Sequence, residues 1–304
     1  MAWVHRLSGE VHRMRFVTFS AAGGRRRPGI VIGDSVEPLG AAVESLEAFI
    51  ALDARARSAA LAAREPAIPL AGVALQAPLA PRKNVFCVGR NYLAHAQEGA
   101  RARGEQLSLP SVPTFFTKAP TAVTGPDATL TLPAAVSSQF DWEAELAVVI
   151  GARCKDVAEA DALGVIFGYT CLNDVSARDL QRAHVQWFKG KSLDDTCPLG
   201  PWIVDAADIP DPGALDISLR VSGVTRQHGN TRAMIFSIPR IIAELSRGMT
   251  LEPGDIIATG TPDGVGFAME PPVFLVDGDV MEVEIEGIGI LRNRVAISAP
   301  VGAR

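Results

Sequence analysis

The most regular hydrophobic pattern of the chain lies between Phe140 and Ile150, where apolar and acidic residues alternate. Because the side chains of a β-strand point alternately to its two faces, this pattern predicts a strand with one apolar and one acidic face. The acidic face carries Asp141, Glu143 and Glu145, and the apolar face carries Phe140, Trp142, Ala144, Leu146, Val148 and Ile150. From Ala147 onward both faces are apolar, so the strand enters the interior beside its acids. Two interpretations stay open: a half-exposed strand with a solvated acidic face, or part of an oxygen-rich metal site, since buried carboxylates need a partner charge.

The N-terminal part of the chain has the pattern of a small α+β unit. Apolar runs on either side of Gly23 and Gly24 predict a β-hairpin, and an alanine-rich stretch over residues 41–64 predicts helices. No residues with recognisable chemistry accompany these elements.

Prolines near residue 80 mark an expected linker between two domains. We therefore expect a small domain at residues 14–78 and a main domain at residues 80–304. A convincing strand begins at Met14, so residues 1–13 are expected to be an extension that is not native.

Beyond the linker, strand and helix patterns mix, which predicts a mixed α/β, strand-rich domain. The expected elements are a buried strand at 84–89, a helix beginning at 90, strands at 140–150 and 165–171, a helix at 175–187, a strand at 256–259 and a C-terminal hairpin around 278–289. The polar residues 99–113 are expected to form either a mobile lid or an ordinary loop.

Composition narrows the function to small-molecule chemistry. The 304 residues are 48% hydrophobic, enough for a large core, and the net charge of -5 disfavours nucleic acid as a partner. No segment approaches the roughly 18 apolar residues that cross a membrane, so no membrane association is expected. The four cysteines are far apart, which predicts reduced thiols rather than disulfides or zinc ligands. Together these features predict a cytoplasmic protein.

Two groups of polar residues fall on predicted helices. His95 and Glu98 are three positions apart and share a helix face, although His95 is equally consistent with a solvated helix residue. Asp174 stands where a helix is expected to begin, so it either caps that helix or contributes to a site with Arg178 and Gln181 on the same face.

A lysine-containing loop and a glycine-rich loop complete the candidates. Lys189 and Lys191 lie around Gly190, and lysines in loops are commonly solvated. Residues 260–266 contain three glycines but match neither dinucleotide-binding nor P-loop spacing, so no nucleotide is expected.

Taken together, these segments resemble the fumarylacetoacetate hydrolase superfamily over residues 80–297. The matching blocks are Val88-Gly89-Arg90-Asn91-Tyr92 with His95 and Glu98, Asp141 to Leu146, Asn173 to Asp179, Lys189 to Ser192, and Gly254-Asp255 through Gly260-Thr261-Pro262 to Gly266. The resemblance implies a catalytic domain with a rolled mixed β-sheet, working as a homodimer behind a small N-terminal domain. Some members carry a carboxylate seven residues before the histidine, where this chain has Val88. That difference favours the acylpyruvase and 2-hydroxyhepta-2,4-diene-1,7-dioate isomerase-like branch.

The resemblance also implies a metal site and a set of functional residues. Glu143, Glu145 and Asp174 are the implied metal ligands, and an all-carboxylate set suits Mg²⁺ first, with Mn²⁺ or Ca²⁺ as alternatives. The implied catalytic residues are His95, oriented by Glu98 to deprotonate a water, and Lys191, which would stabilise an oxyanion. Lys189 competes with Lys191 for that role. The implied substrate-binding residues are Arg178, Gln181, Thr261 and Tyr92.

The expected substrate is a 2-oxo acid, and the leading expectation is hydrolysis of a carbon–carbon bond in an acylpyruvate-type 2,4-dioxo acid. Decarboxylation of a 2-oxo diacid such as oxaloacetate, or isomerisation of a 2-hydroxydienoate, needs the same enolate stabilisation without an attacking water. A protein that binds a 2-oxo acid without turning it over is the third alternative.

Overall fold

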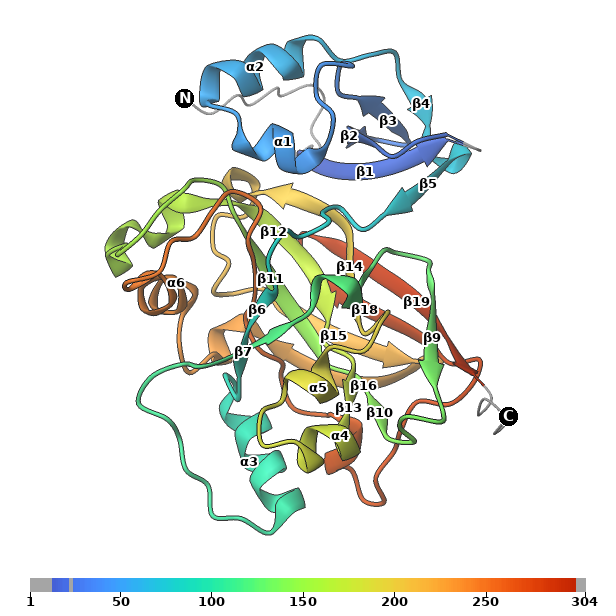
Figure 1. The fold of residues 1–304 in the computed structure, drawn as a ribbon, viewed down its shortest axis with the longest axis vertical. Coiled ribbons are helices and arrows are strands. Elements are labelled where there is room, and N and C mark those ends of the chain that lie inside the picture. The colour runs from blue at the N-terminus through green and yellow to red at the C-terminus, as the bar shows by residue number, and fades with distance from the viewer. Residues whose placement is uncertain (1–12, 22–23, 299–304) are drawn as a thin grey trace.

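The computed structural model describes residues 13–21 and 24–298, and within them the protein is a mixed α/β, strand-rich molecule, which confirms the predicted fold class. Figure 1 shows an N-terminal unit at the top, above a larger body. This unit contains β1 (Arg15–Ala21), β2 (Arg27–Ile32), β3 (Ser35–Pro38), α1 (Leu46–Ala51), α2 (Ala54–Ala62), β4 (Ile68–Pro69) and β5 (Val73–Gln76). Ser45 and Asp53 cap α1 and α2 through their side-chain oxygens, as the alanine-rich helices require at their first turns.

The larger body begins with β6 (Val85–Gly89) and is built mainly from strands. It contains α3 (Leu93–Arg103), β7 (Thr114–Lys118), β8 (Val123–Thr124), β9 (Thr129–Pro133), β10 (Phe140–Asp141), β11 (Ala144–Ile150), β12 (Ile166–Asn173), β13 (Ser176–Ala177), α4 (Arg178–Ala183), α5 (Phe188–Lys191), β14 (Cys197–Asp205), β15 (Asp216–Val221), β16 (Val224–Asn230), α6 (Ile238–Ser246), β17 (Ile256–Ala258), β18 (Val280–Ile285) and β19 (Gly289–Ser298). The predicted C-terminal hairpin is present as the antiparallel pair β18 and β19.

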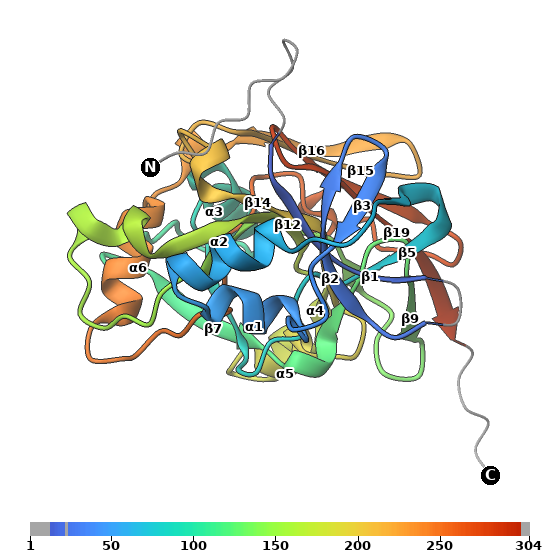
Figure 2. The same ribbon diagram turned by 90° about the horizontal axis from the view of Figure 1, so that it is seen from above.

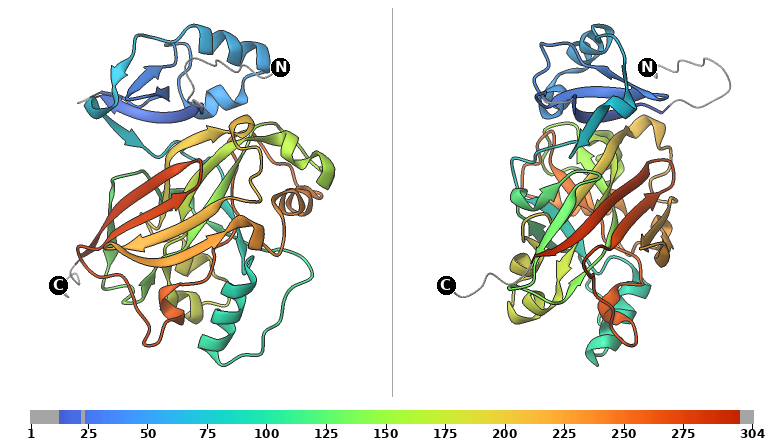
Figure 3. Two further views of the ribbon diagram at one scale, coloured as in Figure 1. Left: turned by 180° about the vertical axis from the view of Figure 1, so that it is seen from behind. Right: turned by 90° about the vertical axis from the view of Figure 1, so that its right-hand side faces the viewer.

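The strands form a large sheet, a smaller sheet and the two-stranded pair β10–β13. The larger sheet has the order β4-β3-β2-β1-β14-β12-β11-β17-β6-β7, with β5 beside β1 and β8 beside β14, and the smaller has the order β16-β15-β18-β19-β9. Both mix parallel and antiparallel pairs. Residues such as Leu146 of β11, Tyr169 of β12 and Leu219 of β15 belong to the same apolar cluster, so one face of the large sheet packs on the small sheet (Figure 3).

The N-terminal unit extends the large sheet and contributes to a second apolar cluster. Its strand β1 continues that sheet by pairing with β14, and the rings of Phe49 in α1 and Phe167 in β12 are 6.3 Å apart. Phe16 contacts both rings, at 5.4 Å and 4.9 Å. Figure 2 shows this unit from above, with α1 and α2 next to each other. The division into domains at residues 14–78 and 80–304 stays a prediction, and residues 1–12 of the predicted extension lie outside the described residues.

The acidic strand differs from its prediction in two respects. The single strand expected at 140–150 is interrupted at Trp142 and Glu143, so β10 pairs with β13 while β11 pairs with β12. All of residues 140–150 are buried, and the acidic face is therefore not a solvated one.

The helices around the later blocks also differ from their predictions. The helix expected from Arg90 begins at Leu93 and continues to Arg103, so the first residues of the predicted lid are helical. The single helix expected at 175–187 is instead β13 followed by the separate short helices α4 and α5. Asp174 accordingly does not cap a helix; Ser176 pairs with Asp141 and Ala177 precedes α4.

Two remaining features concern the whole molecule. All four cysteines are free, and Cys154 is the one that is not buried. Among the described residues, no helix is both long and apolar enough to span a membrane.

Candidate functional site

Three carboxylates from two neighbouring segments meet where β11 begins and β12 ends. Glu143, Glu145 and Asp174 each offer a carboxylate oxygen within 4.8 Å of the others, and all three side chains are buried. They meet because Ala144 pairs with Asn173, which places the residues that flank each of them side by side. The structure thus brings together the three acids that the sequence resemblance singled out as metal ligands.

Backbone hydrogen bonds hold this carboxylate cluster in position. The backbone N–H of Asp174 donates to the carbonyl oxygen of Glu143 (2.8 Å), and the backbone N–H of Glu143 donates to Oδ1 of Asn173 (3.0 Å). The N–H of Gly260 donates to Oε2 of Glu145 (2.7 Å). Gly260 has φ of +102°, a conformation that strongly favours glycine, and its N–H is the backbone donor that the glycine-rich loop supplies to the cluster.

Three buried cations compensate two of the three acids. Lys191 Nζ lies 2.8 Å from both Glu143 Oε2 and Asp174 Oδ2, and Lys118 Nζ lies 2.7 Å from Asp174 Oδ1. Arg178 Nη1 lies 2.7 Å from Glu143 Oε1. Among the described residues, no basic side chain forms an ion pair with Glu145, which makes it the one acid of the cluster whose charge is uncompensated.

The surroundings shift the pKa values of these groups in opposite directions. Burial, followed by the charges of Asp174 and Glu143, raises the pKa of Glu145 well above its ordinary value. Burial alone would raise the pKa of Glu143 as well, but the charges of Lys191 and Arg178 outweigh it and lower that pKa. The pKa of Lys191 is raised despite its burial, because Asp174 and Glu143 favour the ammonium form. The surroundings therefore shift the pKa values of Glu143 and Glu145 in opposite directions.

The cluster fits a divalent cation by its donor set and by its charge. Mg²⁺ and Ca²⁺ prefer carboxylate oxygens at about 2.0 to 2.6 Å, so oxygens on opposite sides of an ion are about 4 to 5 Å apart. The spread of 4.8 Å matches this requirement. A divalent cation would also remove the cost of burying Glu145 without a partner. Glu143, Glu145 and Asp174 are the residues that would hold it, and its identity is not fixed by this geometry.

A cavity of about 770 Å³ opens beside the cluster. We call its buried part the inner end, lined by Glu143, Glu145, Arg178, Lys191 and Thr261, and the part nearer the surface the outer wall, lined by Arg90, Arg103, Glu105, Arg182 and Trp187. The helices α3, α4 and α5 that carry much of this lining lie together at the lower end of the molecule in Figure 1.

His95 lines the cavity and is held by Glu98. His95 Nδ1 lies 2.9 Å from Glu98 Oε1, and the N–H of Gly264 donates to Glu98 Oε2 at 2.9 Å. With Nδ1 engaged in this way, Nε2 is the ring nitrogen left for proton exchange. Both side chains are largely buried, so His95 is not a solvated helix residue.

The other predicted site residues occupy different depths. Lys191 is buried in the cluster, whereas its competitor Lys189 is exposed. Arg178 Nη1 donates to Gln181 Oε1 (3.0 Å), and its Nη2 is buried without a hydrogen-bond partner. Thr261 Oγ1 accepts a hydrogen bond of 2.7 Å from Gln227, and both Gln181 and Thr261 line the cavity.

Tyr92 is the predicted substrate-binding residue that the cavity does not reach. It is 1% exposed, does not belong to the cavity lining, and its hydroxyl is buried without a hydrogen-bond partner. Burial and then the charge of Glu145 raise its pKa. The geometry therefore places Tyr92 behind the cluster, near Glu145, rather than against a substrate.

Two residues make contacts at the site that the sequence analysis did not assign to them. Lys118 is fully buried and donates to Asp174, although it ends an ordinary apolar strand. Asp141 fixes Arg178 through its Nε (2.8 Å) and accepts the backbone N–H groups of Gly266 (2.7 Å) and Phe267 (3.1 Å). The only sequence signal for Lys118 is a charged side chain at the end of an apolar segment, whereas Asp141 already stood out on the acidic face of residues 140–150.

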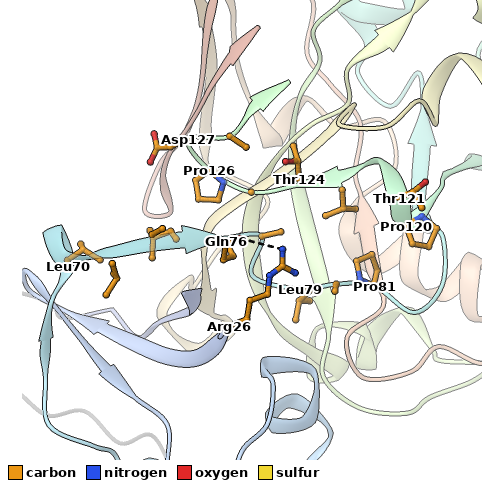
Figure 4. A pocket seen from close by; sticks show the side chains of 18 residues that line it. Arg26, Leu70, Gln76, Leu79, Pro81, Pro120, Thr121, Thr124, Pro126 and Asp127 are labelled. Carbon is orange, nitrogen blue, oxygen red and sulfur yellow. Dashed lines mark hydrogen bonds between the residues drawn. The ribbon is translucent and has the colours of Figure 1, made fainter. Parts of the chain in front are cut away.

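A second cavity, of about 810 Å³, lies between β5, the linker and β8. Figure 4 shows three prolines and two threonines among its lining side chains, and Arg26 Nη2 donates to Gln76 Oε1 at 3.4 Å. It shares no lining residue with the cavity at the carboxylate cluster, and its two charged lining residues are Arg26 and Asp127. The candidate site therefore lies at the cavity of about 770 Å³ and not at this one.

Comparisons with known proteins identify the family of the chain. The chain is 48% identical over 227 residues to an oxaloacetate tautomerase of Bacillus subtilis (strain 168), covering 74% of each chain. A solved fumarylacetoacetate hydrolase from psychrophilic Exiguobacterium antarcticum has a TM-score of 0.80 and 41% identity, covering 94% of this chain and 100% of that one. A 2-hydroxyhepta-2,4-diene-1,7-dioate isomerase from Mycobacterium marinum has a TM-score of 0.75 and 35% identity, covering 94% and 99%. The profile described as Fumarylacetoacetate (FAA) hydrolase C-terminal matches residues 84–296, and the chain belongs to the fumarylacetoacetate hydrolase family.

Proposed function

We propose that this protein is a divalent-metal-dependent enzyme that interconverts the keto and enol forms of a 2-oxo diacid of the oxaloacetate type. The observation that carries this proposal is the buried cluster of Glu143, Glu145 and Asp174, which opens into a cavity that His95 also lines. The oxaloacetate tautomerase of Bacillus subtilis, 48% identical over 227 residues, supports this choice over the hydrolysis expected first from the sequence.

The inner end supplies charge for an enolate. A divalent cation held by the three acids would act as a Lewis acid toward the oxygens of a 2-oxo acid. Lys191 Nζ, poised between two of these acids, donates a hydrogen bond to the oxygen that gains charge at C2. Arg178 keeps the two N–H donors of its buried Nη2 for the C1 carboxylate, while Asp141 and Glu143 hold its other nitrogens.

His95 moves the proton. In the enol-to-keto direction the C2 hydroxyl loses its proton and C3 gains one, and in the reverse direction C3 loses it. Nε2 of His95 is the atom to which we assign the C3 proton, because Glu98 holds Nδ1. No water is consumed in either direction, so the reaction balances without a further reactant.

Hydrolysis of an acylpyruvate is the second candidate, and the pair His95 and Glu98 favours it as well. A histidine oriented by a carboxylate can deprotonate a water as readily as a carbon acid. The fumarylacetoacetate hydrolase from Exiguobacterium antarcticum, at 41% identity, supports this candidate. In that reaction water adds to the distal carbonyl, the carbon–carbon bond breaks, and pyruvate and a carboxylic acid leave.

One experiment separates the two candidates. Purified protein is given oxaloacetate and, separately, an acylpyruvate, each with Mg²⁺ and with a chelator. We expect the ultraviolet absorbance of the oxaloacetate enol to relax faster with Mg²⁺ and at the uncatalysed rate with chelator. His95→Ala should slow this relaxation by about 10² to 10⁴-fold. His184→Ala, at another histidine of the cavity lining, is the matched control and should keep the rate.

The outcomes rank the candidates clearly. If acylpyruvate cleavage, followed as released pyruvate, is faster than oxaloacetate tautomerisation, the hydrolase candidate takes first place. Turnover that is unaffected by chelator, or a His95→Ala variant that is as active as the wild type, contradicts the proposed mechanism.

A further inference from the structure

Arg90 occupies an unusual backbone conformation at the mouth of the cavity. It directly follows β6, lines the cavity, and has φ of +57°, which non-glycine residues rarely adopt. The turn is held by Asn91, whose side chain bonds the backbone of Phe236 (2.8 and 3.0 Å) and of Thr259 (2.8 Å). Such strain persists where surrounding contacts fix it, and it is common at binding sites.

Trp187 forms a platform beneath the Arg90 side chain. The guanidinium carbon lies 5.6 Å from the centroid of the Trp187 ring. A Cβ atom at Gly89 would come within 2.4 Å of that ring, so glycine is needed for the indole to pack there. Phe116 contacts the same indole edge-on, at 5.3 Å and 70°. Trp187, itself held by Gly89 and Phe116, therefore supports the guanidinium, which is not that of a loose surface arginine.

The Arg90 guanidinium lacks a carboxylate partner among the described residues. The nearby carboxylate of Glu105 is bonded to Arg103 instead (2.8 Å). Arg182 is exposed and bonded to Gln139. Burial, followed by the positive charge of Arg103, lowers the pKa of Arg90, so its surroundings disfavour the cation. An anion in the cavity would reverse this electrostatic cost.

We propose that Arg90, supported by Trp187, binds the second carboxylate of a 2-oxo diacid whose 2-oxo acid end lies at the inner end of the cavity. The inference rests on the proposed function and adds the residue that selects diacids over monoacids. A planar guanidinium stacked on an indole presents its N–H groups edge-on, which suits a carboxylate. Arg103 and Arg182 are the weaker choices because each already has a bonding partner.

The test compares two ligands that differ only at the distal end. In 2-oxopentanoate a methyl group replaces the distal carboxylate of 2-oxoglutarate, so the ratio of their dissociation constants isolates the distal contact. Both are titrated calorimetrically into Mg²⁺-loaded wild type, Arg90→Gln, Arg90→Lys and Arg101→Gln. Arg101 lies on α3 outside the cavity lining, so Arg101→Gln is the matched loss of charge.

We expect the wild type and Arg101→Gln to prefer the diacid by about ten- to a hundredfold, as a charge-assisted hydrogen bond would give. Arg90→Gln should reduce that preference to about threefold or less, and Arg90→Lys should fall between because lysine keeps the charge but not the planar fork. Circular dichroism melting checks that each variant folds.

The results distinguish this inference from the function on which it rests. A diacid preference that survives in Arg90→Gln, or that is missing in the wild type, overturns the role of Arg90 while Mg²⁺-dependent binding of 2-oxopentanoate still supports the inner site. If the wild type binds neither 2-oxo acid in a Mg²⁺-dependent manner, the proposed function fails, and the role of Arg90 fails with it.

Discussion

The two ends of one cavity handle charge in different ways. At the inner end, Glu143 and Asp174 each contact two cations, and Asp141 forms an ion pair with the Nε of Arg178. At the outer wall, cations outnumber acids, and Glu105 is the one acid of that wall and already pairs with Arg103. Among the described residues, Glu145 at the inner end is a carboxylate without a cation partner, whereas Arg90 at the outer wall is a cation without a carboxylate partner.

This contrast suggests that the inner end carries out the reaction and that the outer wall selects the ligand. Buried, mutually fixed charges are worth most where charge develops during a reaction, because they need no reorganisation and water does not screen them. Half-exposed charges are screened and contribute mainly to which ligand binds and how fast it arrives. We therefore expect substitutions at the inner end to affect turnover and stability, and changes at the outer wall to affect ligand affinity.

The largest effect is expected from Glu145→Gln. The amide keeps the size of the side chain and can still accept the Gly260 N–H, but it removes a charged ligand from the cluster. Turnover should fall by about a thousandfold or more, since Lewis-acid stabilisation is worth several kcal/mol. Calorimetric titration with Mg²⁺ measures the expected loss of Mg²⁺ affinity directly. The same substitution at the outer wall, Glu105→Gln, should leave Mg²⁺ binding intact. Equal losses of Mg²⁺ affinity in Glu145→Gln and Glu105→Gln would contradict the assignment of the metal site to the inner end.

The second effect is on stability and concerns Lys118. Replacing Lys118 by Met leaves Asp174 with Lys191 as its remaining cation partner. Breaking a buried ion pair from one side typically costs about 3 to 5 kcal/mol, so the free energy of unfolding in urea should fall by about that amount. Lys189→Met, at the exposed lysine, is the matched control and should change stability by about 0.5 kcal/mol or less. A loss below about 1 kcal/mol for Lys118→Met would show that water reaches Asp174.

The contrast also explains which features the sequence could predict. Alternation, which is local in the chain, drew attention to Glu143 and Glu145, whereas Asp174 was identified as their third partner only through the family resemblance. Lys191 was preferred to Lys189 from its block, and the structure buries it. The rest depends on contacts between distant segments: Lys118 is 56 residues from Asp174, and Arg90 depends on a ring 97 positions later in the numbering, at Trp187.

The break in the acidic strand has the same origin. Alternation predicts one continuous strand at 140–150, but Asp141 accepts N–H groups from the segment at 266–267, and Glu143 donates to Asn173. These tertiary hydrogen bonds turn the backbone at Trp142, and no local pattern encodes them. The helix predicted at 175–187 failed similarly, because β13 forms only by pairing with β10.

The third prediction uses the raised pKa of Glu145 in chelated protein. Folded protein binds a proton there at pH values where an unfolded glutamate, with a pKa of about 4.3, has lost it. The unfolded state therefore binds fewer protons, and the free energy of unfolding should fall as pH rises, by up to about 1.4 kcal/mol per pH unit, until the folded pKa is passed. Urea unfolding between about pH 5 and 8 measures this slope. Glu145→Gln should lack this part of the slope, and saturating Mg²⁺ should reduce it in the wild type. Identical slopes in wild type and variant would assign the proton to another group.

The smallest effect is expected from salt, and it acts on the outer wall alone. Between about 0.05 M and 0.5 M ionic strength the screening length falls from above 10 Å to a few Å, which weakens attraction between the half-exposed arginines and a dianionic ligand. The apparent Michaelis constant for a 2-oxo diacid should therefore rise by about two- to fivefold, an estimate taken from the modest strength of exposed ion pairs. The turnover number should stay constant, because Lys191, Lys118 and Arg178 are buried with their partners. Initial rates measured at saturating Mg²⁺ and at both salt concentrations separate the two constants. A turnover number that falls with salt as steeply as the affinity would mean that the inner end is open to ions, and the charge pairs found there would then be no better protected than those of the outer wall.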